Sequence, residues 1–105
     1  MVVKWYAKAS IHWAEMQDYC IAQFGASIAL KSAERVDQQL HILMKYPERG
    51  TPEPLLNKKE IIYRSVHIQK KIKLIYKVDY QHETIFVVDF WNTDMLPNNL
   101  LRRIK

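Results

Sequence analysis

Basic side chains are concentrated in one stretch of the sequence, and they are the residues whose chemistry most clearly indicates a binding or catalytic role. Between positions 58 and 77 a single acid, Glu60, accompanies these cations: Lys58, Lys59, Arg64, Lys70, Lys71, Lys73 and Lys77. This window alone is more positive than the whole chain, whose net charge is +5. The charge favours an acidic partner, either nucleic acid or an acidic peptide. Lysines on the open face of a sheet can equally serve only solubility and resistance to edge pairing.

Arg64 stands out among these cations because it lies inside an otherwise apolar run. A guanidinium in such a strand must extend to solvent, pair with an acid or point into a functional groove. Structural pairing and a binding role both stay open for this residue. Asp89 falls on the side of Ile85 and Val87 in a later strand, where we expect it to pair with a lysine across the ladder.

Several other kinds of site are excluded by residues that are missing or badly spaced. The chain has only two glycines, Gly25 and Gly50, and so has no glycine-rich phosphate loop. Its four histidines lack metal-ligand spacing on one face, and its single cysteine, Cys20, has no partner for a disulfide or a cysteine-based zinc site. We therefore expect no metal and no cofactor.

Length and composition predict one domain, residues 1–105. A chain of 105 residues with 49% hydrophobic content can bury a single modest core. Nothing in it approaches the length of a membrane span, and the first residues lack the apolar core of a secretory signal. With one unpaired cysteine, the simplest expectation is a cytoplasmic protein that does not contact membranes.

The first half of the chain predicts a short strand followed by a helical hairpin. Residues 2–6 can form the strand, and residues 7–24 read as a helix that Gly25 ends. The apolar residues of this helix cover an unusually wide arc of its circumference, which predicts that the helix is buried against two neighbouring elements. Ser27 is the expected N-cap of a second helix that runs to Lys45. Three prolines and a glycine between 46 and 54 then mark the crossover to a sheet.

Three strands follow, roughly 60–68, 71–79 and 83–91, and their short connections predict an antiparallel meander. The fold class is therefore α+β with the element order β-α-α-β-β-β. In the middle strand, Lys71, Lys73, Ile75 and Lys77 alternate with apolar neighbours. The residues expected to face the helices are Ile72, Leu74, Tyr76, Val78, Phe86, Val88 and Phe90.

The order of these elements and their short sequence motifs resemble those of the RelE/ParE superfamily, the plasmid-stabilisation toxins of bacterial type II toxin-antitoxin systems. The similarity covers nearly the whole chain. It is carried by Trp5 and Ala7, Ala29 and Ala33, Leu43 with Pro47-Glu48-Arg49-Gly50, Tyr63-Arg64, Ile75-Tyr76-Lys77-Val78, Phe90-Trp91-Asn92-Thr93 and Pro97. The resemblance implies a helical hairpin packed on a twisted antiparallel sheet to which the N-terminal strand is added. It also implies growth inhibition by the toxin and a cognate antitoxin whose acidic or amphipathic segment wraps it. We expect that segment to place its acids against Lys71, Lys73 and Lys77.

Two activities occur in the family, and the residues after the last strand bear on the choice. RelE-like members cleave mRNA on the ribosome, whereas ParE-like members act on DNA gyrase without known hydrolytic chemistry. If this chain is a ribonuclease, Arg64 matches the family's strand arginine, and Lys71 or Lys73 could face the phosphate. The chain reads Trp91-Asn92-Thr93-Asp94 where a histidine, tyrosine or arginine is usual. Asn92 cannot titrate and Asp94 would repel phosphate, which favours the ParE-like branch and a protein that is not an enzyme.

Two further hypotheses concern the alternative function and the end of the chain. A non-toxic basic binding module that docks an acidic peptide fits the same charge pattern. At the C-terminus, Arg102 and Arg103 stand beside Leu100, Leu101 and Ile104. This tail could extend the basic surface that binds nucleic acid or a partner, or it could be a frayed end.

Overall fold

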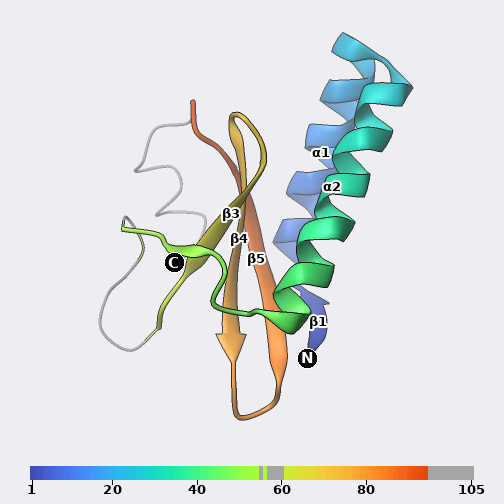
Figure 1. Ribbon diagram of the computed structural model, residues 1–105. Helices are drawn as coiled ribbons and strands as arrows, with labels where there is room; N and C mark the ends of the chain where they lie inside the picture. The colour runs from blue at the N-terminus through green and yellow to red at the C-terminus, as the bar shows by residue number, and fades with distance from the viewer. Residues whose placement is uncertain (55, 57–60, 95–105) are drawn as a thin grey trace.

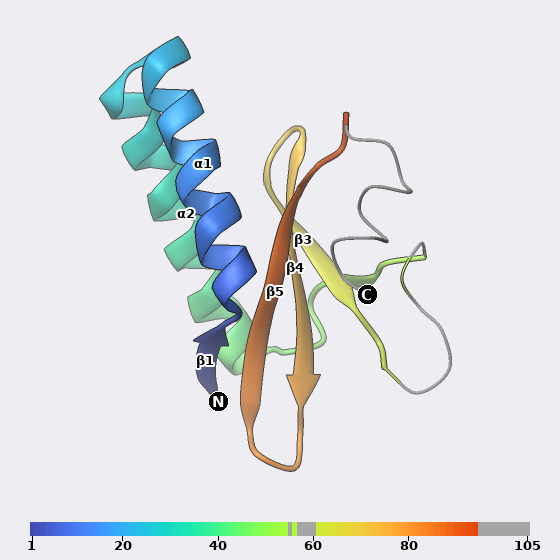
Figure 2. The same cartoon turned by 180° about the vertical axis from the view of Figure 1, so that it is seen from behind.

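A helical hairpin lies against one face of a five-stranded sheet in the computed structural model, which describes residues 1–54, 56 and 61–94 (Figure 1). In chain order the elements are β1 (Val2–Trp5), α1 (Ala7–Phe24), α2 (Ala26–Lys45), β2 (Thr51–Pro52), β3 (Arg64–Gln69), β4 (Ile72–Asp79) and β5 (Thr84–Asn92). The expected α+β architecture is confirmed, and the two-residue strand β2 is added to it. Seen from both sides, the hairpin leans away from the sheet toward the α1–α2 turn (Figures 1 and 2).

The sheet has the order β1-β5-β4-β3-β2. Strands β3, β4 and β5 form the predicted antiparallel meander, and β1 pairs with β5 in parallel at one edge. The helical hairpin connects β1 at this edge to β2. Pro52 lies in β2 at the opposite edge, where a residue without an N–H is tolerated.

Gly25 separates the two helices as the sequence predicts. Its φ of 93° is a left-handed conformation that favours glycine, and its N–H donates to the carbonyl of Ile21. The expected N-cap at Ser27 is wrong, because α2 already begins at Ala26 with Gly25 as its cap and no side-chain cap. The glycine allows so tight a turn that Ser27 falls within the first turn of the helix.

The main core lies between the hairpin and the sheet. Its buried members are Ala9, Val36, Leu40, Leu43, Ile68, Leu74, Tyr76, Ile85, Val87 and Phe90. A second, smaller cluster lies on the opposite face of the sheet, hereafter the outer face, and contains Leu56, Ile75, Val88 and Trp91. The sheet is therefore covered in part on both faces, although the sequence predicted an outer face made mainly of lysines.

A β-bulge in β5 changes the predicted alternation. Tyr76 of β4 is paired with Val87 and Ile75 with Asp89, so Val88 has no opposite residue. The expectation that Phe86 and Val88 face the helices is wrong, because both pack with the outer cluster. Beyond the bulge Phe90 returns to the inner core as predicted, and Ile85 and Val87 occupy inner positions.

Candidate binding surfaces

Arg64 is held by the turn that joins α2 to the sheet. Its Nη1 donates to the carbonyl of Gly50 at 2.9 Å and more weakly to that of Glu48 at 3.4 Å. The hydroxyl of Tyr76 donates to the carbonyl of Pro47 at 2.8 Å and accepts the N–H of Gly50 at 2.9 Å. Arg64 thus pairs with backbone carbonyls, an arrangement that the sequence alone did not distinguish from pairing with an acid.

The turn leaves no room for a side chain at position 50, so glycine is required there. A Cβ there would lie 2.6 Å from the hydroxyl oxygen of Tyr76 and 2.9 Å from the carbonyl oxygen of Ser65. Burial raises the pKa of Tyr76 above its ordinary value of 10.0. The neutral phenol is therefore the form that the fold uses to hold the turn.

Lys73 and Lys77 lie on the outer face. Lys73 Nζ is 3.2 Å from Glu53 Oε2, and Ser65 Oγ donates to the same carboxylate oxygen at 3.0 Å. Glu53 is almost fully buried, so this pair fastens residues 51–54 to the sheet. Lys77 Nζ lies 5.4 Å from the ring centre of Tyr6 and 5.7 Å from that of Phe86. Attraction to the two ring faces holds this ammonium in place.

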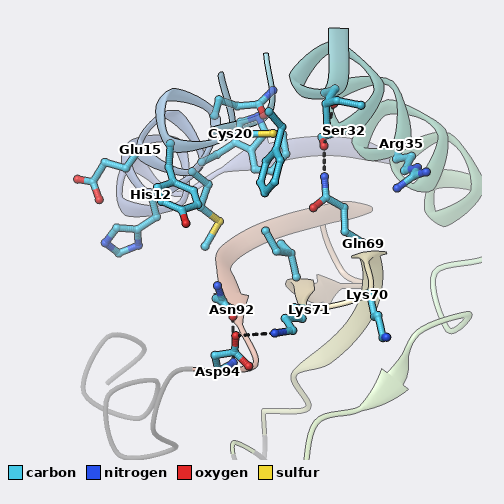
Figure 3. Close-up of a pocket in the computed structure, with 17 residues that line it drawn as sticks. His12, Glu15, Cys20, Ser32, Arg35, Gln69, Lys70, Lys71, Asn92 and Asp94 are labelled. Carbon is cyan, nitrogen blue, oxygen red and sulfur yellow. Dashed lines mark hydrogen bonds and ion pairs between the residues drawn. The ribbon is translucent and has the colours of Figure 1, made fainter. Parts of the chain in front are cut away.

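A groove of about 1270 Å³ opens where the hairpin leans away from the sheet (Figure 3). We call it the hairpin groove. Its lining comes from α1, α2, the β3–β4 turn and the end of β5, and comprises His12, Trp13, Glu15, Met16, Gln17, Tyr19, Cys20, Phe24, Ile28, Ser32, Arg35, Gln69, Lys70, Lys71, Ile72, Asn92 and Asp94. Most of its wall is apolar, with charged side chains along the rim.

Polar contacts join the walls of the hairpin groove. In Figure 3, Gln69 of β3 reaches Ser32 of α2 and donates to its hydroxyl. On the other side, His12 Nδ1 lies 2.7 Å from Oδ1 of Asp89, a fully buried carboxylate. The bulge in β5 lies beside Asp89, and the partner that its Oδ1 meets is His12 of α1, whereas the sequence predicted a lysine across the ladder.

The helices leave apolar side chains uncovered at the mouth of this groove. Tyr19 and Phe24 are each 64% exposed, and Ile28 is 40% exposed. As its wide apolar arc predicted, α1 packs against two neighbours, α2 and β5. Ala9 alone among the described residues of α1 is nevertheless fully buried. The sheet and α2 therefore cover only part of the arc, and the rest faces solvent.

Three cations from two elements line the groove. Arg35 projects from α2, and Lys70 and Lys71 belong to the β3–β4 turn. Lys71 is paired with Asp94 at 3.1 Å between two exposed side chains. Neither Arg35 nor Lys70 makes an ion pair with any residue that the structure describes. The sequence did not indicate Arg35, because only the tertiary fold brings α2 beside this turn.

The structure therefore divides the predicted basic surface. Lys71 borders the hairpin groove, Lys73 and Lys77 lie on the outer face, and Arg64 lies at the turn. Lys58, Lys59, Arg102 and Arg103, with the apolar residues of the tail, fall outside the described residues. Within the described part of the chain, no cluster of three histidine, cysteine or acidic side chains could hold a metal ion. In that same part, no helix is both long and apolar enough to cross a bilayer.

The fold and its surfaces define a class of small α+β domains in which a helical hairpin and a sheet present a large open groove. Residues 3–97 match the family described as the ParE toxin of the type II toxin-antitoxin system, parDE. The chain belongs to this ParE toxin family, and the predicted membership in the RelE/ParE superfamily is confirmed. It is a toxin of the type II class.

A solved structure supports the same fold. The chain resembles a protein of the chromosomal ParDE toxin-antitoxin system from P. aeruginosa, with a TM-score of 0.67 and 18% sequence identity. The similarity covers 88% of this chain and 95% of that one. No curated protein matches the sequence.

Proposed function

We propose that this toxin acts on DNA gyrase and carries no ribonuclease chemistry of its own. The observation that supports the proposal is the engagement of all three candidate ribonuclease cations by groups of the protein itself. Arg64 donates to backbone carbonyls, Lys73 is bound by Glu53, and Lys71 is bound by Asp94. A phosphate would have to displace these contacts, and the carboxylates of Glu53 and Asp94 would repel it.

Acid-base catalysis also needs a titratable group close to the cations. Among the described residues, the end of β5 and the residues after it offer Asn92, which does not titrate, and Asp94, which is paired with Lys71. His12 lines the hairpin groove together with Lys71, but its Nδ1 is bound to Asp89, and it lies on the other face of the sheet from Lys73. This distribution favours action by binding over action by hydrolysis.

The test compares two purified systems. We expect the protein to inhibit supercoiling by gyrase or to trap gyrase on cleaved DNA, and to leave mRNA on translating ribosomes uncut. Lys31→Ala, at an exposed position of α2, removes one positive charge as Arg64→Ala does and serves as a control that should behave like wild type. Codon-specific mRNA cleavage that Arg64→Ala abolishes while the variant stays folded would overturn the proposal.

We also propose that a cognate antitoxin occupies the hairpin groove. The uncovered apolar side chains Tyr19, Phe24 and Ile28 suit the apolar face of an amphipathic segment. Arg35 and Lys70 stand at the rim without ion pairs to other described residues and suit its acids. Lys73 and Lys77 lie on the outer face and are too far around the sheet to belong to the same groove.

A further inference from the structure

A second hollow of about 290 Å³ lies at the outer face, beside the end of β4. We call it the outer hollow, and its lining includes Ile61, Ile62, Lys77, Tyr80 and Phe86. Three of these side chains are exposed: Ile61 by 47%, Ile62 by 52% and Tyr80 by 55%. Isoleucines grouped in this way around a concave surface are typical of an interaction site.

Lys77 gives the hollow a fixed positive charge. The rings of Tyr6 and Phe86 hold its ammonium, and no described residue makes an ion pair with it. Because these ring contacts favour one position of the side chain, a partner's carboxylate can bind it with a smaller loss of conformational entropy. Lys73 differs in this respect, since Glu53 already neutralises it.

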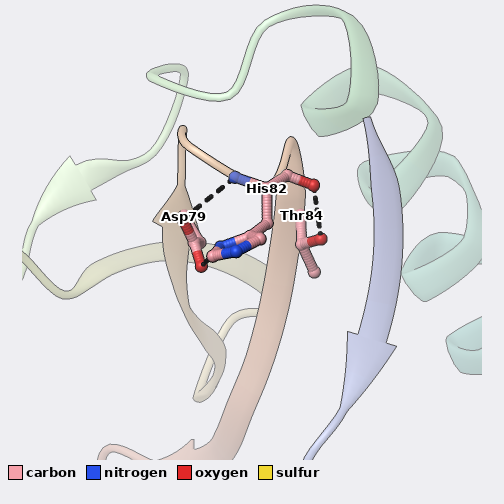
Figure 4. A network of polar contacts seen from close by, with 3 residues as sticks. All are labelled: Asp79, His82 and Thr84. Atoms are coloured by element: carbon pink, nitrogen blue, oxygen red, sulfur yellow. Dashed lines mark hydrogen bonds and ion pairs between the residues drawn. The ribbon is translucent and has the colours of Figure 1, made fainter.

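The acid in the lining, Asp79, is bound within its own turn. Asp79 Oδ2 lies 2.8 Å from His82 Nδ1, and Asp79 Oδ1 accepts the backbone N–H of His82 at 3.2 Å (Figure 4). These hydrogen bonds from His82 lower the pKa of Asp79 below its ordinary value. The hydroxyl of Thr84 donates to the carbonyl of His82 and fixes the same turn. The carboxylate of Asp79 is thereby held at the β4–β5 turn.

We propose that the outer hollow is the surface through which the toxin contacts its target protein, by receiving an apolar side chain that is flanked by a carboxylate. The apolar side chain enters between Ile61, Ile62 and Phe86, and the carboxylate pairs with Lys77. The inference rests on the proposed function in taking the chain to act by binding a macromolecule. A protein segment fits better than a nucleic acid because two of the three exposed residues are isoleucines and Lys77 is the one cation among the described residues of the lining, whereas a nucleic-acid strand calls for several exposed rings and several cations.

This assignment separates two surfaces on one small domain. The hairpin groove opens toward the helices, and the outer hollow lies across the sheet from the inner core. A substitution in the outer hollow should therefore affect the toxin's action and spare its binding to the antitoxin.

The experiment uses Lys77→Glu and Ile62→Asp in the full chain, with Lys31→Glu as the charge-matched control. Each variant is measured for growth arrest on induction, for affinity toward purified antitoxin and for inhibition of gyrase. We expect both hollow variants to lose growth arrest and to weaken gyrase inhibition by about tenfold or more, as for substitutions at the centre of an interface. Their affinity for antitoxin should stay within about twofold of wild type, which also shows that they fold.

Full growth arrest by both hollow variants would overturn the inference. Binding of a labelled single-stranded oligonucleotide that Lys77→Glu abolishes and Ile62→Asp leaves unchanged would overturn the choice of a protein segment. If wild type arrests growth and does not inhibit gyrase, the gyrase proposal fails. Growth arrest then still tests the outer hollow, so the two failures can be told apart.

Discussion

At the scale of single residues, Tyr76 connects the core of the sheet to the turn that precedes it. Its ring is fully buried and its hydroxyl satisfies both the N–H of Gly50 and the carbonyl of Pro47. Removing the hydroxyl leaves two backbone groups without that partner. Tyr76→Phe should therefore lower the free energy of unfolding by about 1–3 kcal/mol near neutral pH.

The same residue predicts a dependence on alkaline pH. The unfolded chain releases the Tyr76 proton near pH 10, whereas burial raises the pKa in the folded chain. The stability that this residue provides is thus complete below pH 10 and is lost as pH rises toward the folded pKa. In denaturant unfolding at several pH values, the stability difference between wild type and Tyr76→Phe should shrink above pH 10. Tyr46→Phe, at a tyrosine that is 63% exposed, is the control, and a difference independent of pH would contradict the argument.

At the scale of elements, β4 is the strand on which both faces of the sheet depend. It carries Leu74 and Tyr76 in the inner core and Ile75 in the outer cluster. Its long pairing with β5 spans residues 72–79 and contains the bulge that lies beside Asp89. The partner that Oδ1 of this carboxylate meets is His12 of α1, in the wall of the hairpin groove.

Leu74→Ala tests the inner register of β4. The side chain is fully buried, so truncation should lower the free energy of unfolding by about 2–5 kcal/mol through lost apolar burial and a cavity. Leu30→Ala removes the same atoms from a leucine of α2 that is 62% exposed, and it should change stability by no more than about 0.5 kcal/mol. Chemical denaturation of both variants measures the contrast. Equal effects would show that Leu74 does not face the hairpin.

At the scale of the whole molecule, the charges around the hairpin groove should control association with the antitoxin. Arg35→Glu combined with Lys70→Glu reverses both rim cations that lack ion pairs to other described residues. We expect slower association and about tenfold or more weaker binding in low salt, with a flatter dependence on ionic strength. Lys77→Glu changes a charge on the outer face and is the control. Unchanged affinity of the double variant in low salt would place the antitoxin's acids elsewhere.

The sequence by itself determined the elements and the family. Glycine at position 25, the proline-rich crossover and strand alternation in residues 72–79 are local signals, and each predicts an element from its own residues. The helical hairpin, the meander and the inner positions of Leu74 and Tyr76 are confirmed for this reason. The order of the elements was sufficient to indicate the RelE/ParE superfamily.

Only the tertiary structure decided where the cations point and what they contact. Phe86 and Val88 were assigned to the wrong face because a bulge shifts a strand's alternation by one residue, and apolar residues on both sides of the bulge conceal it from sequence. Arg64 donates to the carbonyls of residues 48 and 50, and Arg35 lines the same groove as the β3–β4 turn, although these residues are far apart along the chain. The charge of the window 58–77 was evident in the sequence. Its division between a groove, a turn and an outer face depends on how helices and strands pack, which local patterns do not record.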